Sequence, residues 1–223
     1  MILYHGSPYI IKKPEYGKGR IDNDYGRGFY CTEDNNLGKE WAVDENRDGY
    51  VNRYDLDLRG LTVLDLNSSD YCVLHWITVL LSNRKFDLDT PLSREAFSYL
   101  SKNFMPDLSG ADVIRGYRAD DSYFSFAQDF INGIISVSQL TQALKLGRLG
   151  EQVVLKSPKA FGQIQYLGCE GALACEWYDV KKQRDRTARK EYFDMNKTGY
   201  IRGDLYIVRI IDEEVKPDDV RLR

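Results

Sequence analysis

Short apolar segments of β-strand character occur near both ends of this 223-residue chain and enclose a mostly helical middle. Apolar runs and alternations typical of strands lie at residues 2–5, 28–32, 50–56, 61–66, 111–115, 152–155, 161–167 and 205–211. Helical patterns lie at residues 37–42, 71–81, 93–104, 122–131, 136–146 and 172–192. This order predicts one α+β domain over residues 1–223, with a helical insertion at about 70–105 and a C-terminal helix plus strand.

Some local signals predict more than the type of element. Residues 50–56 and 61–66 are separated by Arg59-Gly60, which predicts a pair of neighbouring strands. Thr32 or Asp34 is expected to cap the first helix, and Ser93 the helix at residues 93–104.

The composition excludes several classes of protein. Hydrophobic residues make up 43% of the chain, so there is enough apolar material for a core and the chain is not disordered as a whole. Lys and Arg number 31 against 34 Asp and Glu, and this net charge of −3 argues against holding nucleic acid by bulk charge. Histidine occurs only twice, which excludes a metal site built from several histidines.

The sequence also predicts where the protein resides. No apolar stretch approaches the roughly 18 residues that a membrane span needs, and the first residues show no signal-peptide pattern. Cys31, Cys72, Cys169 and Cys175 are scattered, without the spacing of a metal knuckle. Free cysteines are typical of a reducing compartment. We therefore expect a cytoplasmic protein with no membrane contact and no metal.

Two motifs in the first 32 residues carry groups that suit ligand binding. In residues 3–7, Leu-Tyr-His-Gly-Ser, His5 offers an imidazole, and the following glycine lets a ligand approach the backbone. In residues 24–32, two glycines flank an arginine ahead of Phe29 and Tyr30, which suits a flat ligand. A turn at a strand end and a glycine turn entering an aromatic strand are the plainer interpretations.

A third motif lies two-thirds along the chain, in residues 149–155. Glu151 and Gln152 open an apolar strand there. Side chains alternate along a strand, so one member of this pair faces a cleft and the other does not. A solvated strand start is the alternative interpretation.

The order and character of these motifs resemble the ADP-ribosyltransferase superfamily in its His-Tyr-Glu branch, which includes the poly(ADP-ribose) polymerases and diphtheria-toxin-like enzymes. The chain resembles most narrowly an uncharacterised bacterial family, a domain of unknown function grouped with that superfamily. The resemblance rests on residues 3–7, 19–42, 118–130 and 144–167. It implies an ADP-ribosyltransferase-like split β-sheet core and NAD⁺ as the substrate, with no metal.

The resemblance also implies roles for three residues. His5 would form a hydrogen bond with a ribose hydroxyl, and Tyr30 would stack on the nicotinamide ring. Gly6 would hold the nicotinamide carboxamide through its backbone groups.

Further contacts with the dinucleotide are expected around these positions. Ser7 or Arg20 would contact the adenosine or pyrophosphate part, and Tyr25 is a second stacking candidate. Tyr4 and Gly28 complete the set of cofactor-binding residues.

The acid of the family can be placed in two registers. Direct alignment puts Gln152 at the position of the acid, with Glu151 just before it. Either Glu151 faces the cleft and is the acid, or Gln152 faces it and a carboxylate from elsewhere assists, or catalysis is weak or absent. Asp120 and Asp121 are the external candidates, although both also suit the N-terminal cap of the following helix.

A carboxylate matters because breaking the nicotinamide–ribose bond leaves an oxocarbenium-like sugar and a neutral leaving group. Rigid clamping of the ring and negative charge near the developing cation both speed that step. The resemblance therefore implies a bacterial mono-ADP-ribosyltransferase acting on protein or nucleic acid, as a toxin or defence effector with a possible antitoxin or immunity partner. A non-catalytic NAD⁺ or ADP-ribose binding module and an NAD⁺ glycohydrolase are the alternatives.

Two other features receive a plain interpretation. His75 lies in an apolar helical segment and is expected to be a core residue. The basic run at residues 181–190 is expected to be a solvated helix face rather than a phosphate-binding patch, but it is where a nucleic-acid backbone would bind.

Overall fold

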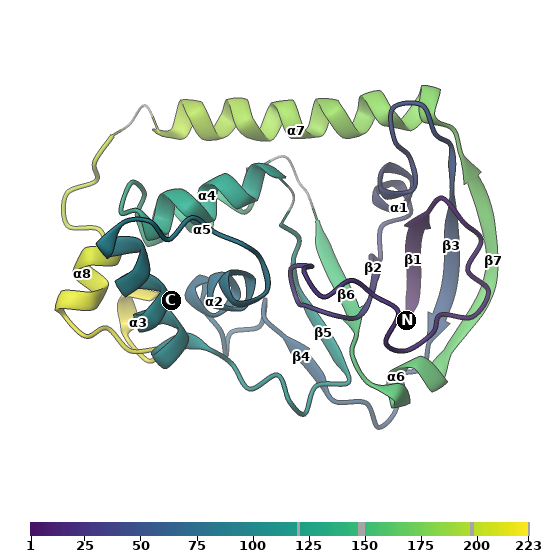
Figure 1. The fold of residues 1–223 in the computed structure, drawn as a ribbon, viewed down its shortest axis with the longest axis horizontal. Helices are drawn as coiled ribbons and strands as arrows, with labels where there is room; N and C mark the ends of the chain where they lie inside the picture. The colour runs from purple at the N-terminus through teal and green to yellow at the C-terminus, as the bar shows by residue number, and fades with distance from the viewer. Residues whose placement is uncertain (120, 147–149, 197–198, 223) are drawn as a thin grey trace.

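The computed structural model describes residues 1–119, 121–146, 150–196 and 199–222, and of residues 121–123 and 196 only the backbone. Its chain forms two β-sheets with helices around them, which confirms the α+β class (Figure 1). The three-stranded sheet has the order β1 (Ile2–Ser7), β3 (Gly49–Leu56), β7 (Ile164–Ala172) and is antiparallel. The four-stranded sheet has the order β2 (Phe29–Cys31), β6 (Glu151–Leu155), β5 (Val113–Tyr117), β4 (Val63–Asp65).

The two sheets are joined near the start of the chain. The backbone amide of Tyr4 in β1 donates to the carbonyl of Thr32, just after β2, at 2.8 Å, and the amide of Thr32 donates back at 2.9 Å. Strands β1 and β2 therefore run side by side at this point while belonging to different sheets (Figure 1).

A bundle of short helices packs against one face of the four-stranded sheet. It comprises α2 (Val73–Asn83), α3 (Pro91–Phe104), α4 (Asp121–Ile131), α5 (Val137–Ala143) and α8 (Ile207–Asp212). These five helices are called the helical half below. Every residue of α2 from Leu74 to Leu81 is buried, because the helix is apolar on all sides and lies inside the bundle.

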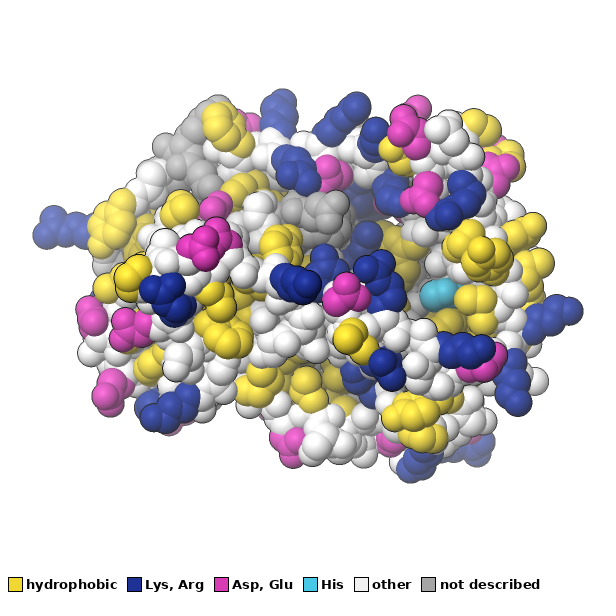
Figure 2. Space-filling view, viewed as in Figure 1, with side chains coloured by type: hydrophobic (Ala, Val, Ile, Leu, Met, Phe, Trp, Pro, Cys, Tyr) yellow, Lys and Arg dark blue, Asp and Glu magenta, His cyan; other side chains and the backbone are white. Residues whose placement is uncertain are grey.

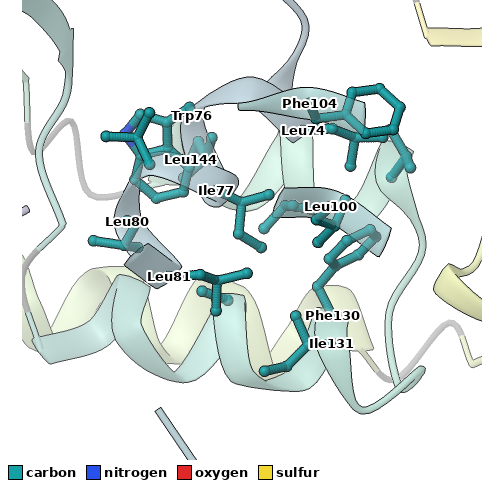
Figure 3. Packing of buried hydrophobic residues seen from close by; sticks show 14 of the residues in the cluster. Leu74, Trp76, Ile77, Leu80, Leu81, Leu100, Phe104, Phe130, Ile131 and Leu144 are labelled. Carbon is teal, nitrogen blue, oxygen red and sulfur yellow. The ribbon is translucent and has the colours of Figure 1, made fainter. Parts of the chain in front are cut away.

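Figure 3 shows the packing at the centre of the helical half. Ile77 of α2 lies toward Leu100 of α3 and Phe130 of α4, while Trp76 of α2 lies on the other side, beside Leu144. The predicted helical segment at 70–105 therefore contributes many residues to the largest apolar cluster of the described residues and is not a peripheral addition.

Helix α1 (Asn35–Ala42) packs closely on β1 because a glycine lies at the contact. A Cβ atom placed on Gly6 would come within 2.2 Å of the carbonyl oxygen of Gly38. The cap of α1 is Asp34, whose carboxylate accepts hydrogen bonds from the amides of Asn36 and Leu37.

Helix α7 (Ala174–Asn196) is the longest element and runs along one side of the molecule, over α1 at one end and over α4 at the other (Figure 1). It follows β7 directly and carries the basic run predicted from the sequence.

Several predicted elements differ from the structure. Residues 205–211 were expected to form a strand, but they contribute to α8. Ile207 and Ile210 are both buried, and residues three apart share one face of a helix but lie on opposite faces of a strand. Packing against α3 therefore decides the helix.

The neighbouring strands predicted at residues 50–56 and 61–66 exist as β3 and β4 but lie in different sheets. Both edges of β3 are occupied, by β1 and by β7, so β4 pairs with β5 instead. Residues 161–167 begin in the short helix α6 (Pro158–Gln163) before β7 starts. The cap of α3 is Thr90, whose hydroxyl accepts from the amide of Ser93, the residue expected as the cap.

Candidate functional site

A pocket of about 850 Å³ opens where the two sheets meet. Its walls come from β1, the long loop at residues 8–28, β2, α1 and β6. The volume lies within the roughly 300–1,000 Å³ of small-molecule and cofactor sites. His5, Tyr30 and Gln152, one from each of the three sequence motifs, line this pocket together.

The imidazole of His5 is held in one tautomer. Its Nδ1 lies 2.6 Å from the carbonyl oxygen of Tyr30, which can only accept, so Nδ1 carries the proton. Burial lowers the pKa of His5, which favours the neutral ring. Nε2 is then an acceptor, available for a hydroxyl of a ligand.

The phenol of Tyr30 is fixed by the glycine-rich loop. Its hydroxyl donates to the carbonyl of Gly26 at 2.6 Å and accepts from the amide of Tyr25 at 3.0 Å. Burial raises the pKa of Tyr30, so it is a neutral ring on the pocket wall.

The backbone of Gly6 is oriented by the register of β1. The backbone carbonyl of Met1, just before β1, accepts a hydrogen bond from the amide of Leu56 in β3. In an antiparallel pair every second residue points its backbone N–H and C=O at the partner strand, so Leu3 and His5 do so as well. The backbone N–H and C=O of Tyr4 point away from β3 and pair with Thr32. Gly6, two residues beyond Tyr4, therefore directs its N–H and C=O away from β3, to the side on which β2 lies.

The two candidates for the family acid, Glu151 and Gln152, are neighbours in β6, and their side chains point to opposite faces of the strand. Gln152 is 5% exposed and lines the pocket, whereas the carboxylate of Glu151 receives a hydrogen bond from Nε of Arg115 at 2.7 Å. Glu151 does not line the pocket. Of the alternatives left open by the sequence, the first, in which Glu151 faces the cleft, does not match this geometry.

A different carboxylate lies beside Gln152. Nε2 of Gln152 donates to Oδ2 of Asp24 at 3.0 Å, and the backbone amide of Ala119 donates to the same oxygen at 2.9 Å. Asp24 is 4% exposed and lines the pocket. Within the described residues, Oδ1 of Asp24 and Oε1 of Gln152 have no hydrogen-bond partner.

The charge of Asp24 is only partly compensated. Burial raises the pKa of its carboxyl, while the Ala119 amide and the Arg84 guanidinium, whose Nη1 lies 3.6 Å from Oδ1, oppose that rise. A buried carboxylate at a pocket wall, with one oxygen that makes no hydrogen bond, is a common feature of functional sites.

Arg118 and Trp41 complete this wall of the pocket. The guanidinium of Arg118 lies 5.0 Å from the centre of the Trp41 ring, within the range of a cation–π contact. Nε1 of Trp41 is buried and, among the described residues, has no hydrogen-bond partner.

The other predicted contacts divide into residues on the pocket and residues behind it. Ser7, Arg20 and Gly28 line the pocket. Tyr25 is instead a core residue, 2% exposed, whose hydroxyl donates to the carbonyl of Tyr117 at 2.6 Å. Tyr4 packs its side chain against α1, and only its backbone contributes to the join between the sheets.

Asp120 and the side chain of Asp121 lie outside the described residues. The backbone of Asp121 begins α4. This position agrees with the helix-start interpretation and leaves the catalytic one untested.

The sequence analysis missed Asp24, Arg84, Arg118 and Trp41 as pocket residues. Asp24 is in the second motif, but no local pattern distinguishes it from a turn residue. Its partner Gln152 is 128 positions away along the chain. Only the pairing of β2 with β6 brings the two together.

The described residues show neither a membrane-spanning helix nor a cluster of metal ligands. Across the described residues, no helix combines the length and the apolar character needed to cross a membrane. Over that same part of the chain, no three His, Cys, Asp or Glu side chains are grouped so as to hold a metal ion.

Comparison with known proteins identifies a family but no activity. Residues 1–166 match the model of a family described as "Protein of unknown function (DUF3990)". The chain belongs to the DUF3990 family. Neither the curated proteins nor the solved structures contain a match. The DUF3990 match includes β1, β2 and β6, and with them His5, Tyr30 and Gln152.

Proposed function

We propose that this DUF3990 protein is an NAD⁺-dependent mono-ADP-ribosyltransferase that modifies a macromolecule. The observation that carries the proposal is that His5, Tyr30 and Gln152, from three distant motifs, line one pocket of dinucleotide size. The sequence resemblance assigns NAD⁺ contacts to the same three positions. We extend the resemblance to the fold, as a split sheet joined at β1 and β2.

The pocket and the backbone of Gly6, which lies between the lining residues His5 and Ser7 but is not itself in the lining, offer groups for each part of the nicotinamide riboside. Nε2 of His5 accepts a hydrogen bond from a ribose hydroxyl, as its tautomer requires. The Tyr30 ring stacks on the nicotinamide, and the N–H and C=O of Gly6 pair with the carboxamide. These contacts hold the glycosidic bond in one orientation.

The reaction breaks the bond between ribose C1′ and the nicotinamide nitrogen. The bonding electrons leave with the nitrogen, so nicotinamide departs neutral and the sugar becomes an oxocarbenium-like cation. A nucleophile of the acceptor forms the new bond to C1′ and loses its proton to solvent.

Asp24 supplies the negative charge that the cation needs. In this proposal the Gln152 amide and the Asp24 carboxylate together hold the ribose, with Oδ1 of Asp24 turned toward the sugar. This is the arrangement in which Gln152 faces the cleft and a carboxylate from elsewhere assists. Removing such a charge costs about 10²–10³ in rate.

One observation favours a second candidate, a non-catalytic NAD⁺ or ADP-ribose binding module. Gln152, a neutral amide, occupies the position at which the His-Tyr-Glu branch has its acid. Binding without turnover would then be the whole function. The toxin or defence role and the antitoxin or immunity partner rest on the resemblance alone, whereas the expected cytoplasmic location rests on the scattered cysteines.

Incubation with radiolabelled NAD⁺ and a bacterial lysate tests the proposal. We expect label on a macromolecule and release of nicotinamide, both lost in His5→Ala and Tyr30→Ala. Lys12→Ala is the matched control. Lys12 is exposed on the loop at residues 8–28, which forms part of the pocket wall, but its own side chain does not line the pocket. Free nicotinamide without an adduct would indicate a glycohydrolase, binding without turnover would indicate the module, and no uptake of NAD⁺ by calorimetry would refute all three.

A further inference from the structure

A second hollow, of about 480 Å³, opens beside the pocket against α7. It shares Arg84, Arg118 and Ala119 with the pocket, so the two spaces adjoin. Figure 2 shows Lys and Arg side chains gathered around the hollowed middle of this face, next to a histidine.

The hollow adjoins the part of the pocket that contains Asp24, where the proposed reaction takes place. Ala119 belongs to both walls, and its amide holds Oδ2 of Asp24 at 2.9 Å. A molecule bound in the hollow can therefore contact Ala119, the residue whose amide binds the Asp24 carboxylate that the proposed function assigns to the ribose. An acceptor needs this position, since its nucleophile must reach C1′.

The hollow is positively charged although the chain has a net charge of −3. Five cationic and three acidic side chains line it, namely Arg84, Arg118, Lys181, Lys182, Arg184, Glu40, Asp44 and Asp185.

Each of the three carboxylates is already paired. Glu40 is 1% exposed and receives hydrogen bonds from Arg184 on both of its oxygens, at 2.7 to 3.2 Å. Asp185 pairs with Arg189 at 2.9 Å and Asp44 pairs with Arg47. Arg47 and Arg189 lie outside the hollow's wall. Within the wall, Arg184 pairs with Glu40, and Nζ of Lys181 lies 3.8 Å from Asp44. Five cations against three carboxylates still leave an excess of positive charge in the wall that a ligand meets.

Aromatic rings accompany these cations. Nζ of Lys182 lies 4.7 Å from the ring centre of Tyr178, which also lines the hollow. Arg118 lies over Trp41 at the boundary with the pocket. Cations that follow a phosphate backbone, combined with rings on which bases stack, are the usual elements of single-stranded nucleic-acid sites.

We propose that this hollow binds the acceptor and that the acceptor is a nucleotide of single-stranded RNA or DNA. Its role as acceptor site rests on the proposed function, whereas nucleic-acid binding does not. A space of this volume holds a ligand of nucleotide size, and enzymes that modify a base act on one that is out of the duplex stack. The transfer joins C1′ to a nitrogen or oxygen of the bound nucleotide, while neutral nicotinamide leaves and the proton passes to solvent.

Fluorescence anisotropy with mixed-sequence single-stranded DNA and RNA oligonucleotides, without NAD⁺, tests the site directly. Lys182→Glu is expected to weaken binding about tenfold and to reduce the dependence on salt. Tyr178→Ala is expected to weaken it by a factor of about 5–100, because a stacking ring is lost, and Tyr178→Phe restores it.

Lys190→Glu is the matched control, since it makes the same charge change on an exposed position of α7 outside the hollow. Thermal unfolding checks that all variants fold. Absence of binding by the unaltered protein, or equal losses in Lys182→Glu and Lys190→Glu, would overturn the site.

Labelled NAD⁺ with the same oligonucleotides, and separately with nuclease-treated lysate protein, tests the acceptor. Label on the oligonucleotide supports the proposal. Label on protein alone would overturn it in favour of a protein acceptor. Oligonucleotide binding with the expected variant pattern, but no release of nicotinamide, would support the binding site and count against the proposed function instead.

Discussion

The helical half and the cleft between the sheets differ in how many buried polar side-chain atoms lack a hydrogen bond. Among the described residues the five helices of the helical half hold one such atom, Oγ of Ser101 in α3. The centre of the helical half is an apolar cluster to which α2, α3 and α4 contribute leucines, isoleucines and aromatic rings. The cleft buries a carboxylate, an amide and an indole N–H, in Asp24, Gln152 and Trp41. Each of these carries an atom without a hydrogen-bond partner in the described residues.

That difference has a cost in stability. Leaving a buried polar group without a hydrogen bond costs about 1–3 kcal/mol, whereas each buried apolar side chain contributes about 1.5–3 kcal/mol. The helical half therefore stabilises the fold, and the cleft retains polar groups that are available to hydrogen-bond with a ligand. Four substitutions or titrations, taken from the largest expected effect to the smallest, test this contrast.

Phe130→Ala should act on stability alone. Phe130 is fully buried in the helical half, and removing a buried phenylalanine costs about 3–5 kcal/mol. Chemical denaturation should show the loss, while NAD⁺ affinity measured well below the melting temperature stays unchanged. A stable variant that no longer binds NAD⁺ would contradict the division between the two regions.

Asp24→Asn should lower turnover without lowering the stability of the fold. We expect nicotinamide release to fall by about 10²–10³, equivalent to roughly 3–4 kcal/mol of activation free energy, because the charge near the sugar is lost. Stability should be equal or higher at neutral pH. The raised pKa of Asp24 means that the folded state favours its neutral form, and the contribution of this group to stability is lost as pH rises through that pKa.

The hydrogen bonds around Asp24 can survive Asp24→Asn. The remaining carbonyl oxygen of the asparagine can take the place of Oδ2, where it still accepts from Nε2 of Gln152 and from the amide of Ala119. The new NH₂ group then takes the place of Oδ1, on the side of Arg84. Unchanged turnover in Asp24→Asn would remove Asp24 from the mechanism.

The pH dependence of kcat should show an acid limb. Asp24 must be ionised to stabilise the cation, and burial raises its pKa above the ordinary value of about 3.9, so activity is lost as pH falls through that raised pKa. The charged groups facing it are Arg84 and Arg118, which both favour ionisation.

His5 lines the same pocket and titrates below its usual pKa of 6.5, so it is the other source of an acid limb. Comparing pH profiles separates the two groups. The limb should disappear from the residual activity of Asp24→Asn. A limb that persists unchanged there would assign the titration to His5.

Glu151→Gln should have the smallest effect. Its pair with Arg115 is 33–38% exposed, and such partly solvated pairs contribute about 0–1 kcal/mol. Turnover should stay within about twofold of the original rate, and the melting temperature should change by only a few degrees. A large loss of turnover with normal stability would restore Glu151 as the acid.

Local signals in the sequence were sufficient for most elements of the fold. The apolar segment at residues 71–81 predicted α2, and the run at 152–155 predicted β6, because their composition and length suit only those structures. The same reasoning failed at residues 205–211. There a β-branched segment forms a helix because Ile207 and Ile210 both pack into the helical half.

The candidate site was predicted in outline. His5, Tyr30 and one member of the Glu151/Gln152 pair were expected to face one cleft. The structure places His5, Tyr30 and Gln152 on the pocket. Tyr25 was expected to face the cleft as well but is buried behind it. Tyr25 lies in the turn beside Gly26, before β2 begins, so the alternation of side chains along a strand does not predict which way it points.

The sequence by itself determined the elements that carry the site, since strand-end glycines, apolar alternation and helix caps are local properties of a few neighbouring residues. Only the tertiary structure decided which carboxylate is available. Asp24 meets Gln152 because β2 pairs with β6, while the pleat of β6 turns Glu151 toward Arg115. The pairing and register of strands depend on contacts between residues far apart in the chain.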